Sequence, residues 1–167
     1  MEIYIVRHAI AMERDEWTGS DEKRPLTEKG KKKMEQIAQG LAAMEIDFTH
    51  VFSSPLVRAQ QTAEILQTVF KIDHLDETDL LVPSGDPAAI IPFLNKLPDN
   101  AEVALVGHEP NVSELLSYLL SGQHKSFSLF KKGGVAMLEG FAPLRAGQLT
   151  LRWFMEPNHL VAIGEAE

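Results

Sequence analysis

Short apolar segments alternate with one-faced helical patterns along the first two thirds of the chain. Three segments are rich in Ile, Val, Phe and Leu and are bounded by turn residues: 2–6, 49–52 and 102–106. Between them, apolar residues fall at positions i, i+3, i+4 and i+7, as do Met34, Ile37, Ala38 and Leu41. Strands alternating with helices predict an α/β fold, a three-layer sandwich in which helices flank a mostly parallel central sheet.

Residues that can cap a helix precede each helical pattern. Thr27 precedes a helix expected over 28–44, and Ser54 precedes one expected over 56–70. Asn111 opens the sequence Asn-Val-Ser-Glu, which has the spacing of a capping box at the start of a third helix. These signals support the helix positions that the apolar spacing predicts.

The last third of the chain is more strand-like. Residues 134–140 and 147–155 indicate a hairpin that extends the sheet in the antiparallel direction. A further short helix is expected within 86–97, and the polar, irregular stretch 11–23 is expected to form a loop over one edge. Because the chain contains no repeat or Gly/Ser-rich linker, we expect a single domain over 1–167.

Composition excludes several classes of function. The chain has no cysteine, which excludes disulfides and thiolate nucleophiles and leads us to expect a cytoplasmic protein. No apolar run approaches the roughly 20 residues that span a bilayer, and no targeting signal is visible. A net charge of −8 argues against general affinity for nucleic acid or anionic membranes. A few converging arginines can nevertheless select an anion, since close charges in a dry site outweigh distant ones.

Basic side chains follow all three predicted strands. The first strand runs directly into Arg7 and His8. Arg58 lies in the first turn of the helix after the second strand, and Gly107 and His108 follow the third. Ligands of open α/β sheets bind beyond the carboxyl ends of the strands. We therefore expect two arginines and two histidines to meet at one edge of the sheet.

A phosphoryl group is the ligand that matches this set of side chains. The planar guanidinium of arginine binds phosphate oxygens through two parallel hydrogen bonds, and a neutral imidazole can attack phosphorus in line. An unperturbed histidine pKa of about 6.5 leaves a neutral fraction at physiological pH. Phosphoryl transfer asks the protein mainly for positioning and charge neutralisation, so this set needs no metal or other cofactor.

Other uses of these residues are open to test. A metal site is the competing use of His8 and His108, but two nearby arginines oppose a divalent ion, and a third ligand at close spacing is missing. Taken alone, Arg7 and His8 could form a polar end to a strand. The remaining histidines lack such a context and are expected to be ordinary surface or packing residues: His50, His74, His124 and His159.

Four sequence blocks resemble the signature blocks of one family. In chain order they read IVRHAIA, LTEKG, VFSSPLVRAQQTAEIL and VALVGHEPNVSEL. They are similar to the blocks of the histidine phosphatase superfamily, which has the phosphoglycerate-mutase-like fold. The chain is most similar to SixA-type phosphohistidine phosphatases in its short length and in three sequence motifs: RPLTEKG, SSPLVRAQQTA and GHEP. The resemblance runs from residue 2 to about residue 120 and, more loosely, to the closing hairpin. Ala9 stands where the wider superfamily has glycine.

The resemblance implies a role for each matching residue. His8 matches the nucleophile that becomes phosphorylated, and Arg7 matches its phosphate-binding neighbour. Arg58 matches the second arginine of the phosphate clamp, and His108 matches the second histidine, which contacts phosphoryl oxygens. Arg24 occupies a position that is also arginine in the SixA group, where it would line the mouth of the site; a surface ion pair is the alternative for this residue.

The general acid and the substrate are less determined by the resemblance. Many members use a carboxylate to protonate the leaving oxygen, and Glu77 and Glu109 are both candidates here. Each could instead be an ordinary solvated acid, and Glu109 could favour a helix N-terminus. The short chain lacks large insertions, which suits a phosphohistidine displayed on a signalling protein. The alternatives are a small phosphomonoester substrate and a phosphate-binding module without turnover.

Overall fold

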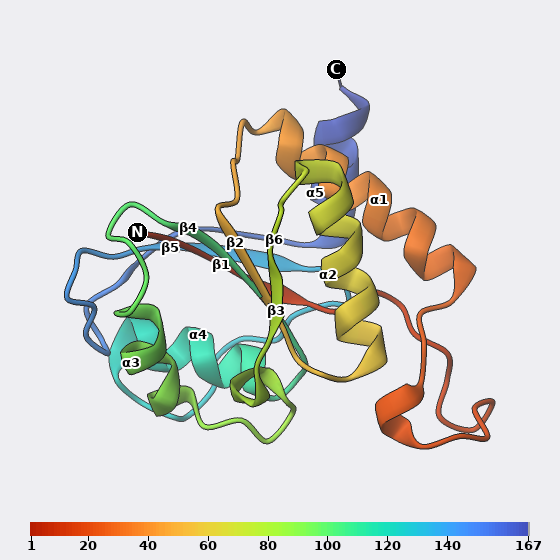
Figure 1. Ribbon diagram of the computed structural model, residues 1–167, viewed down its shortest axis with the longest axis horizontal. Helices are drawn as coiled ribbons and strands as arrows, with labels where there is room; N and C mark the ends of the chain where they lie inside the picture. Colours follow the sequence, from red (N-terminus) through yellow and green to blue (C-terminus); the bar gives the residue numbers. More distant parts are fainter. Residues whose placement is uncertain (167) are drawn as a thin grey trace.

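Six strands form one mixed sheet in the order β3-β2-β4-β1-β5-β6 (Figure 1). The computed structural model describes residues 1–166. The strands are β1 (Glu2–Arg7), β2 (His50–Ser53), β3 (Leu75–Glu77), β4 (Glu102–Gly107), β5 (Val135–Glu139) and β6 (Thr150–Met155). Strands β1 to β4 run parallel to one another. β5 runs antiparallel to β1, and β6 runs antiparallel to β5. The α/β fold with a parallel centre and an antiparallel C-terminal hairpin is therefore confirmed.

Helices cover both faces of this sheet (Figure 1). α1, α2 and α5 lie on one face, and α3 and α4 lie on the other. Their bounds are α1 (Glu28–Ala43), α2 (Val57–Phe70), α3 (Ile90–Leu94), α4 (Asn111–Ser121) and α5 (Pro157–Glu165), with short 3₁₀ helices η1 (Asp21–Lys23), η2 (Asp79–Leu81) and η3 (Pro87–Ala89). The two helical layers and the sheet make the predicted three-layer sandwich. None of the described helices is long and apolar enough to cross a membrane.

The central strand β1 is buried on both faces. Tyr4 and Val6 pack into the core beneath α1, α2 and α5, whereas Ile3 and Ile5 pack into the core beneath α3 and α4. Successive strand residues point to opposite faces, so a strand covered on both sides has an unbroken apolar sequence. This burial makes the carboxyl end of β1 a rigid support for the residues that follow it.

The start of α1 packs tightly against the chain just after His8. Thr27 caps the helix as predicted, since its Oγ1 accepts a hydrogen bond of 2.9 Å from the Gly30 N–H. A Cβ atom at Gly30 would lie 2.0 Å from the carbonyl oxygen of Ile10. Only glycine permits this approach, so the Thr-Glu-Lys-Gly sequence holds α1 against the segment that carries the candidate nucleophile.

The other two predicted caps are wrong in detail. No side chain caps α2, whose N-cap residue is Leu56. Nor does Asn111 cap α4: Pro110 is the N-cap residue, and the Asn111 amide donates to the carbonyl of Gly85 at 2.9 Å. The side chains of Ser54 and Asn111 are used in tertiary contacts instead, which sequence spacing alone cannot distinguish from local caps.

Several elements differ from the sequence-based expectation. The strand β3 and the helix α5 were not predicted. Residues 11–23 form mainly a loop, as expected, with Ala11 bridged to Leu26 and η1 at its end. The expected short helix within 86–97 is divided between η3 and α3. These differences leave the arrangement of the three predicted strands unchanged.

Candidate active site

A cleft of about 510 Å³ lies beyond the carboxyl ends of the parallel strands. The end of β1, the segment after β2 and the segment after β4 all contribute to it, and the loop 12–24 borders it. Its lining residues are Arg7, His8, Glu13, Arg14, Asp15, Arg24, Arg58, Pro83, His108, Glu109 and Lys132. The cleft brings together both histidines and both arginines that follow the strands, as well as Arg24.

Backbone hydrogen bonds hold His8 in place on several sides. Its N–H donates to the carbonyl of Gly107 at 2.9 Å, and the Arg7 N–H donates to the carbonyl of Gly134 at 3.1 Å. The Gly133 N–H donates in turn to the carbonyls of Arg7 and His8. Because β4 and the segment before β5 both bind this short stretch, the imidazole of His8 stands on a fixed backbone.

The hydrogen bonding of His8 determines its tautomer. Nδ1 lies 2.7 Å from the carbonyl oxygen of Ala9. A carbonyl oxygen only accepts, so Nδ1 carries the proton and donates it, and the lone pair of the neutral ring is on Nε2. A neutral Nε2 on a ring that lines the cleft is the form of histidine that can act as a nucleophile.

The surroundings of both histidines favour their neutral forms. His8 is 5% exposed, and burial followed by the nearby His108 lowers the pKa of His8 well below its usual value of 6.5. Burial and then the charge of Arg58 lower the pKa of His108 to about 3. The two rings lie 5.0 Å apart between centroids. Both imidazoles are therefore uncharged at neutral pH.

Each arginine of the expected clamp is anchored by part of its guanidinium. Nη1 of Arg7 donates to the carbonyl of Phe130 at 2.5 Å. Nη1 and Nη2 of Arg58 donate to the backbone oxygen of Asp21 at 2.8 Å and to its Oδ2 at 3.1 Å. In the described part of the chain, the Nε atoms of both arginines are buried without a hydrogen-bond partner. Such donors need an acceptor that the protein does not supply.

Asp21 links three arginines at the rim and was missed by the sequence reasoning. Its Oδ1 accepts from Nε of Arg24 at 3.0 Å and lies 3.7 Å from Nε of Arg14, while Oδ2 contacts Arg58. The two neighbouring arginines Arg24 and Arg58 lower the pKa of Asp21 against the opposing effect of burial. Asp21 thus remains a carboxylate that orients two buried guanidiniums. No sequence signal marks it, because it lies in an irregular loop.

Arg24 is a buried residue, which argues against a purely surface ion pair. It is 7% exposed, its Nη1 donates to the carbonyl of Met12 at 2.6 Å, and it lines the cleft. Arg24 therefore both lines the cleft and pairs with Asp21.

Thr62 connects the segment that follows His8 to α2 and was also missed by the sequence reasoning. Its Oγ1 accepts from the Ala9 N–H at 3.0 Å and donates to the carbonyl of Arg58 at 2.7 Å. The sequence pattern identifies Thr62 only as part of the buried helix face. The hydroxyl thus links the backbone of Arg58 to that of Ala9, the residue after His8.

The two candidate acids lie in different places. Glu109 lines the cleft, where its Oε1 accepts from the Ser113 hydroxyl at 2.6 Å and from the Phe130 N–H at 3.1 Å. Glu77 lies at the end of β3, is exposed, and accepts a hydrogen bond from the Gln60 amide. It is not among the described residues that line the cleft.

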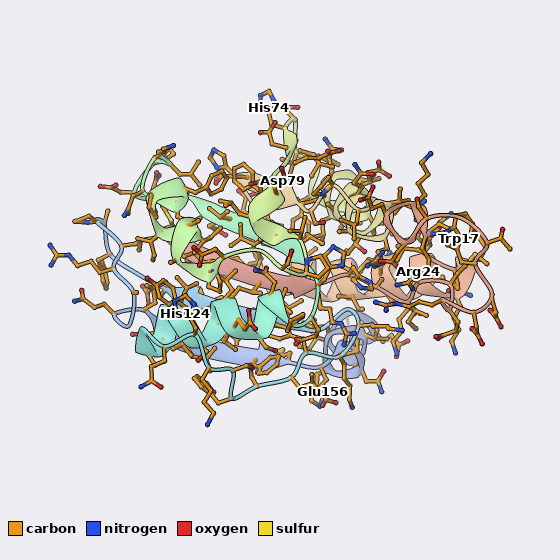
Figure 2. The ribbon with its side chains drawn as sticks, turned by 90° about the horizontal axis from the view of Figure 1, so that it is seen from below. Trp17, Arg24, His74, Asp79, His124 and Glu156 are labelled. Carbon is orange, nitrogen blue, oxygen red and sulfur yellow. The ribbon has the colours of Figure 1, made fainter. Side chains whose placement is uncertain are left out.

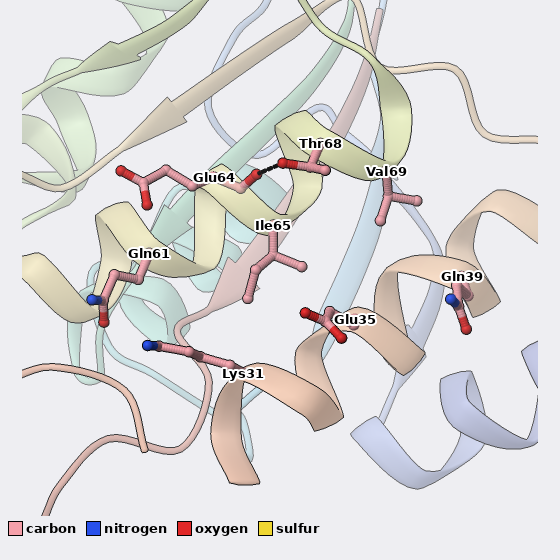
Figure 3. Close-up of a pocket in the computed structure, with 8 residues that line it drawn as sticks. All are labelled: Lys31, Glu35, Gln39, Gln61, Glu64, Ile65, Thr68 and Val69. Atoms are coloured by element: carbon pink, nitrogen blue, oxygen red, sulfur yellow. Dashed lines mark hydrogen bonds between the residues drawn. The ribbon is translucent and has the colours of Figure 1, made fainter. Parts of the chain in front are cut away.

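The rest of the molecule offers no comparable cluster in the residues that the structure describes. His74 and His124 lie away from Arg24 on the outside of the molecule (Figure 2). No group of three His, Asp or Glu side chains suited to a metal ion occurs within residues 1–166. A second hollow of about 390 Å³ between α1 and α2 is lined by Lys31, Glu35, Gln39, Gln61, Glu64, Ile65, Thr68 and Val69 (Figure 3). It has neither an arginine nor a histidine.

Buried neutral histidines predict that the fold loses stability in mild acid. Folding lowers the pKa values of His8 and His108, so below about pH 6.5 the unfolded chain binds protons that the folded chain excludes. The free energy of unfolding is expected to fall from about pH 7 to pH 5, with a slope of up to about 1.4 kcal/mol per pH unit for each histidine. Urea denaturation at several pH values measures this slope. It should flatten in the double variant His8→Gln, His108→Gln, and an unchanged slope there would contradict the assignment.

Comparisons with known proteins agree with the geometry of the cleft. The histidine phosphatase superfamily (branch 1) matches residues 3–83. An uncharacterized protein of Picosynechococcus is 36% identical over 145 residues, which cover 85% of this chain and 87% of that protein. The phosphohistidine phosphatase SixA of Escherichia coli is 28% identical over 163 residues, covering 96% of each chain.

A solved structure extends this similarity to the whole fold. The structure of the protein histidine phosphatase SixA complexed with tungstate superimposes with a TM-score of 0.85 at 27% identity. The match covers 96% of this chain and 99% of that one. Sequence blocks, strand order and relatives are consistent with one another, and the chain therefore belongs to the histidine phosphatase superfamily.

Proposed function

We propose that this protein is a metal-independent phosphohistidine phosphatase in which His8 is the nucleophile. Membership of the superfamily supports a histidine phosphatase activity. The phosphohistidine substrate and the roles of the individual residues are inferred from the cleft. Arg7, Arg58 and His108 would bind the phosphoryl oxygens, with Arg24 at the mouth of the site.

Three buried nitrogens that lack a hydrogen-bond partner within residues 1–166 are the observation that supports this most strongly. They are Nε of Arg7, Nε of Arg58 and Nδ1 of His108, all on residues that line one cleft with His8. The two guanidinium N–H groups are donors, and a buried donor that lacks a partner costs roughly 1–3 kcal/mol, so their presence at one cleft indicates a ligand whose oxygens accept hydrogen bonds. A phosphoryl group has three such oxygens and the charge to match the arginines. The related SixA structure holds tungstate, a tetrahedral oxyanion of similar shape.

The geometry supports a reaction in two steps. In the first, the Nε2 lone pair of His8 attacks phosphorus, a P–N bond forms on His8, and the bond to the leaving group breaks with its electron pair. In the second, a water oxygen attacks phosphorus, the electron pair of the P–N bond returns to Nε2 of His8, and the product leaves as dihydrogen phosphate, which carries both protons of the water and gives one up to solvent. The arginines neutralise the charge on the phosphoryl oxygens in both steps.

The surroundings of the candidate acids suit a leaving group that does not depend on protonation by a strong general acid. Of the two candidate acids, Glu109 lines the cleft, as Glu13 and Asp15 also do, and its Oε1 accepts hydrogen bonds from the Ser113 hydroxyl and the Phe130 N–H. Glu77 is placed outside the cleft lining. An imidazole nitrogen leaves more easily than an alkoxide, so a phosphohistidine substrate does not require a strong general acid. If a carboxylate does assist, we propose Glu109.

The surface beside the cleft suits a phosphate carried on a protein. Lys132 lines the cleft, and the segment before it exposes Phe127 by 64% and Leu129 by 75%. Phe130 follows Leu129 in the chain. Its carbonyl accepts a hydrogen bond from Arg7, and its N–H donates one to Glu109. Exposed apolar side chains so close to a phosphate site are expected at a protein contact rather than around a small soluble metabolite.

Turnover of two substrates tests the proposed function. We expect kcat/KM for a phosphohistidine-bearing protein domain to exceed that for p-nitrophenyl phosphate by at least about tenfold, which is about 1.4 kcal/mol of extra transition-state binding. EDTA should not change either rate. Preference for small phosphate esters would favour a metabolite phosphatase, and phosphate binding without any turnover would favour a binding module. Loss of activity with EDTA would contradict the metal-independent mechanism.

A further inference from the structure

Ser54 is buried next to the second histidine rather than at a helix cap. It is 0% exposed and lies just after β2, where its N–H donates to the carbonyl of Val106 at 3.0 Å. Its Oγ lies 2.8 Å from Nε2 of His108. The serine that the sequence places before α2 therefore reaches across the sheet edge to the segment after β4.

The hydrogen bonds around this hydroxyl determine which way it donates. Ser54 Oγ accepts from the Leu56 N–H at 3.2 Å, which occupies one of its lone pairs. Its single proton needs an acceptor, and Nε2 of His108 is the group in contact that can accept. If Nε2 carried a proton instead, the buried hydroxyl of Ser54 would be left without an acceptor, which is costly. The consistent arrangement is Ser54 O–H donating to an unprotonated Nε2.

A neutral ring with an unprotonated Nε2 carries its proton on Nδ1. This Nδ1 is one of the buried atoms without a partner in the described residues, and His108 lines the cleft with His8 and both arginines. An N–H at this position would donate to a phosphoryl oxygen. The other tautomer would present a lone pair to that negatively charged oxygen, which would be repulsive.

We propose that Ser54 is a positioning residue that holds His108 in its neutral, Nδ1-protonated form so that Nδ1–H donates to the phosphoryl group. This inference rests on the proposed function of the cleft. Ser54 acts through His108 and so supports the phosphate-binding residues without contacting phosphate itself.

Several charges face His108 and also act on its protonation. Burial and Arg58 have the largest effects, and together they keep the ring uncharged, with the pKa lowered to about 3. Charge selects the neutral ring but not its tautomer, so the direction of the Ser54 hydrogen bond is the feature that selects Nδ1–H. The other charged or titratable groups that face the ring are Asp21, Arg24, Arg7 and His8. All of them are unchanged in a Ser54 variant.

The ¹⁵N resonances of the histidine rings test the tautomer directly in the wild-type protein. At neutral pH, His108 is expected to show a protonated Nδ1 and an unprotonated Nε2, with the signals assigned by their loss in His108→Gln. Addition of inorganic phosphate should shift the Nδ1 signal most. A protonated Nε2 or a doubly protonated ring in the wild type would overturn the proposal, even if no Ser54 variant folded. The tautomer is measured without any turnover. The proposal for Ser54 can therefore fail or hold independently of the proposed phosphatase activity.

Two neighbouring serine variants provide a matched comparison. Ser53 is equally buried, and its Oγ donates to the carbonyl of Ser54 rather than to His108. Ser54→Ala is expected to shift His108 toward a mixture of tautomers and to lower kcat/KM by about tenfold, the effect of losing one hydrogen bond of typical strength. Ser53→Ala should leave the tautomer of His108 unchanged. Equal effects of the two variants on the tautomer, or no effect of Ser54→Ala, would refute the role of Ser54.

Discussion

Replacing His8 with alanine is expected to lower kcat by at least about a thousandfold, because the substitution removes the proposed nucleophile. His8 is fixed by backbone bonds to Gly107 and Gly133, and its Nδ1–H donates to the Ala9 carbonyl, which leaves Nε2 for the phosphoryl group. No other described side chain in the cleft repeats this arrangement. The measurement is steady-state turnover of a phosphohistidine protein by the purified variant.

The control for this loss is a histidine outside the cleft. His124 lies far from Arg24 in Figure 2, so His124→Ala should retain wild-type turnover. Inorganic phosphate should still bind to His8→Ala within a few-fold of the wild-type affinity, since both clamp arginines remain. Turnover by His8→Ala at a rate near that of the wild type would remove His8 as the nucleophile.

The second large effect is expected at Arg58. Arg58→Ala should lower kcat/KM by about a hundredfold to a thousandfold, the usual cost of removing a donor that stabilises transition-state charge. Arg24→Ala should cost about ten times less. Both arginines are buried and both bind Asp21, but Nε of Arg24 is bonded to Asp21, whereas Nε of Arg58 is buried with no partner among residues 1–166. Measurement of kcat/KM for the two variants on one substrate gives the ranking.

Loss of activity in Arg58→Ala or Arg24→Ala could also come from a destabilised fold or from the lost positive charge, and both effects can be measured. Urea denaturation of each variant shows whether loss of the contact with Asp21 has destabilised the fold. Arg58→Lys keeps the charge but loses the planar fork, so it should recover only part of the activity. A larger loss for Arg24→Ala than for Arg58→Ala would mean that the phosphate clamp has been assigned incorrectly.

The sequence predicts β1, β2 and β4 well, because strands that are buried in the sheet are made of short runs of apolar residues. Tyr4 and Ile5 face opposite cores, so the residues of β1 between Glu2 and Arg7 are all buried and form one apolar run. The change from apolar to basic residues at that point marks the edge of the sheet. Similar changes after β2 and β4 explain why residues far apart in sequence could be placed together.

The elements that were missed have weaker or overlooked signals. β3 is a short edge strand in which Asp76 and Glu77 are exposed, so it lacks an apolar pattern. The helix α5 does carry a start signal, with Pro157 in its first turn and a capping box between Glu156 and His159. The strand predicted over 147–155 ends just before this signal, and no helix is predicted after it.

The supporting residues of the site depend on contacts that no local pattern shows. Asp21 belongs to an irregular loop, yet it binds Arg58 from 37 positions earlier in the chain. Ser54 has the spacing of a helix cap but binds His108, which is 54 positions later. Sequence blocks therefore locate the groups that would touch phosphate, whereas the groups that orient them emerge only from the fold.

Direct detection of the phosphorylated enzyme tests the central claim most closely. The wild-type protein, mixed briefly with a phosphohistidine protein and quenched in base, is expected to gain the mass of one phosphoryl group. Peptide mass spectrometry should place that group on His8, and it should be lost on brief exposure to acid, as expected of a phosphohistidine. A phosphoryl group on another residue, or release of phosphate during turnover without any phosphorylated enzyme under several quench times, would contradict the account.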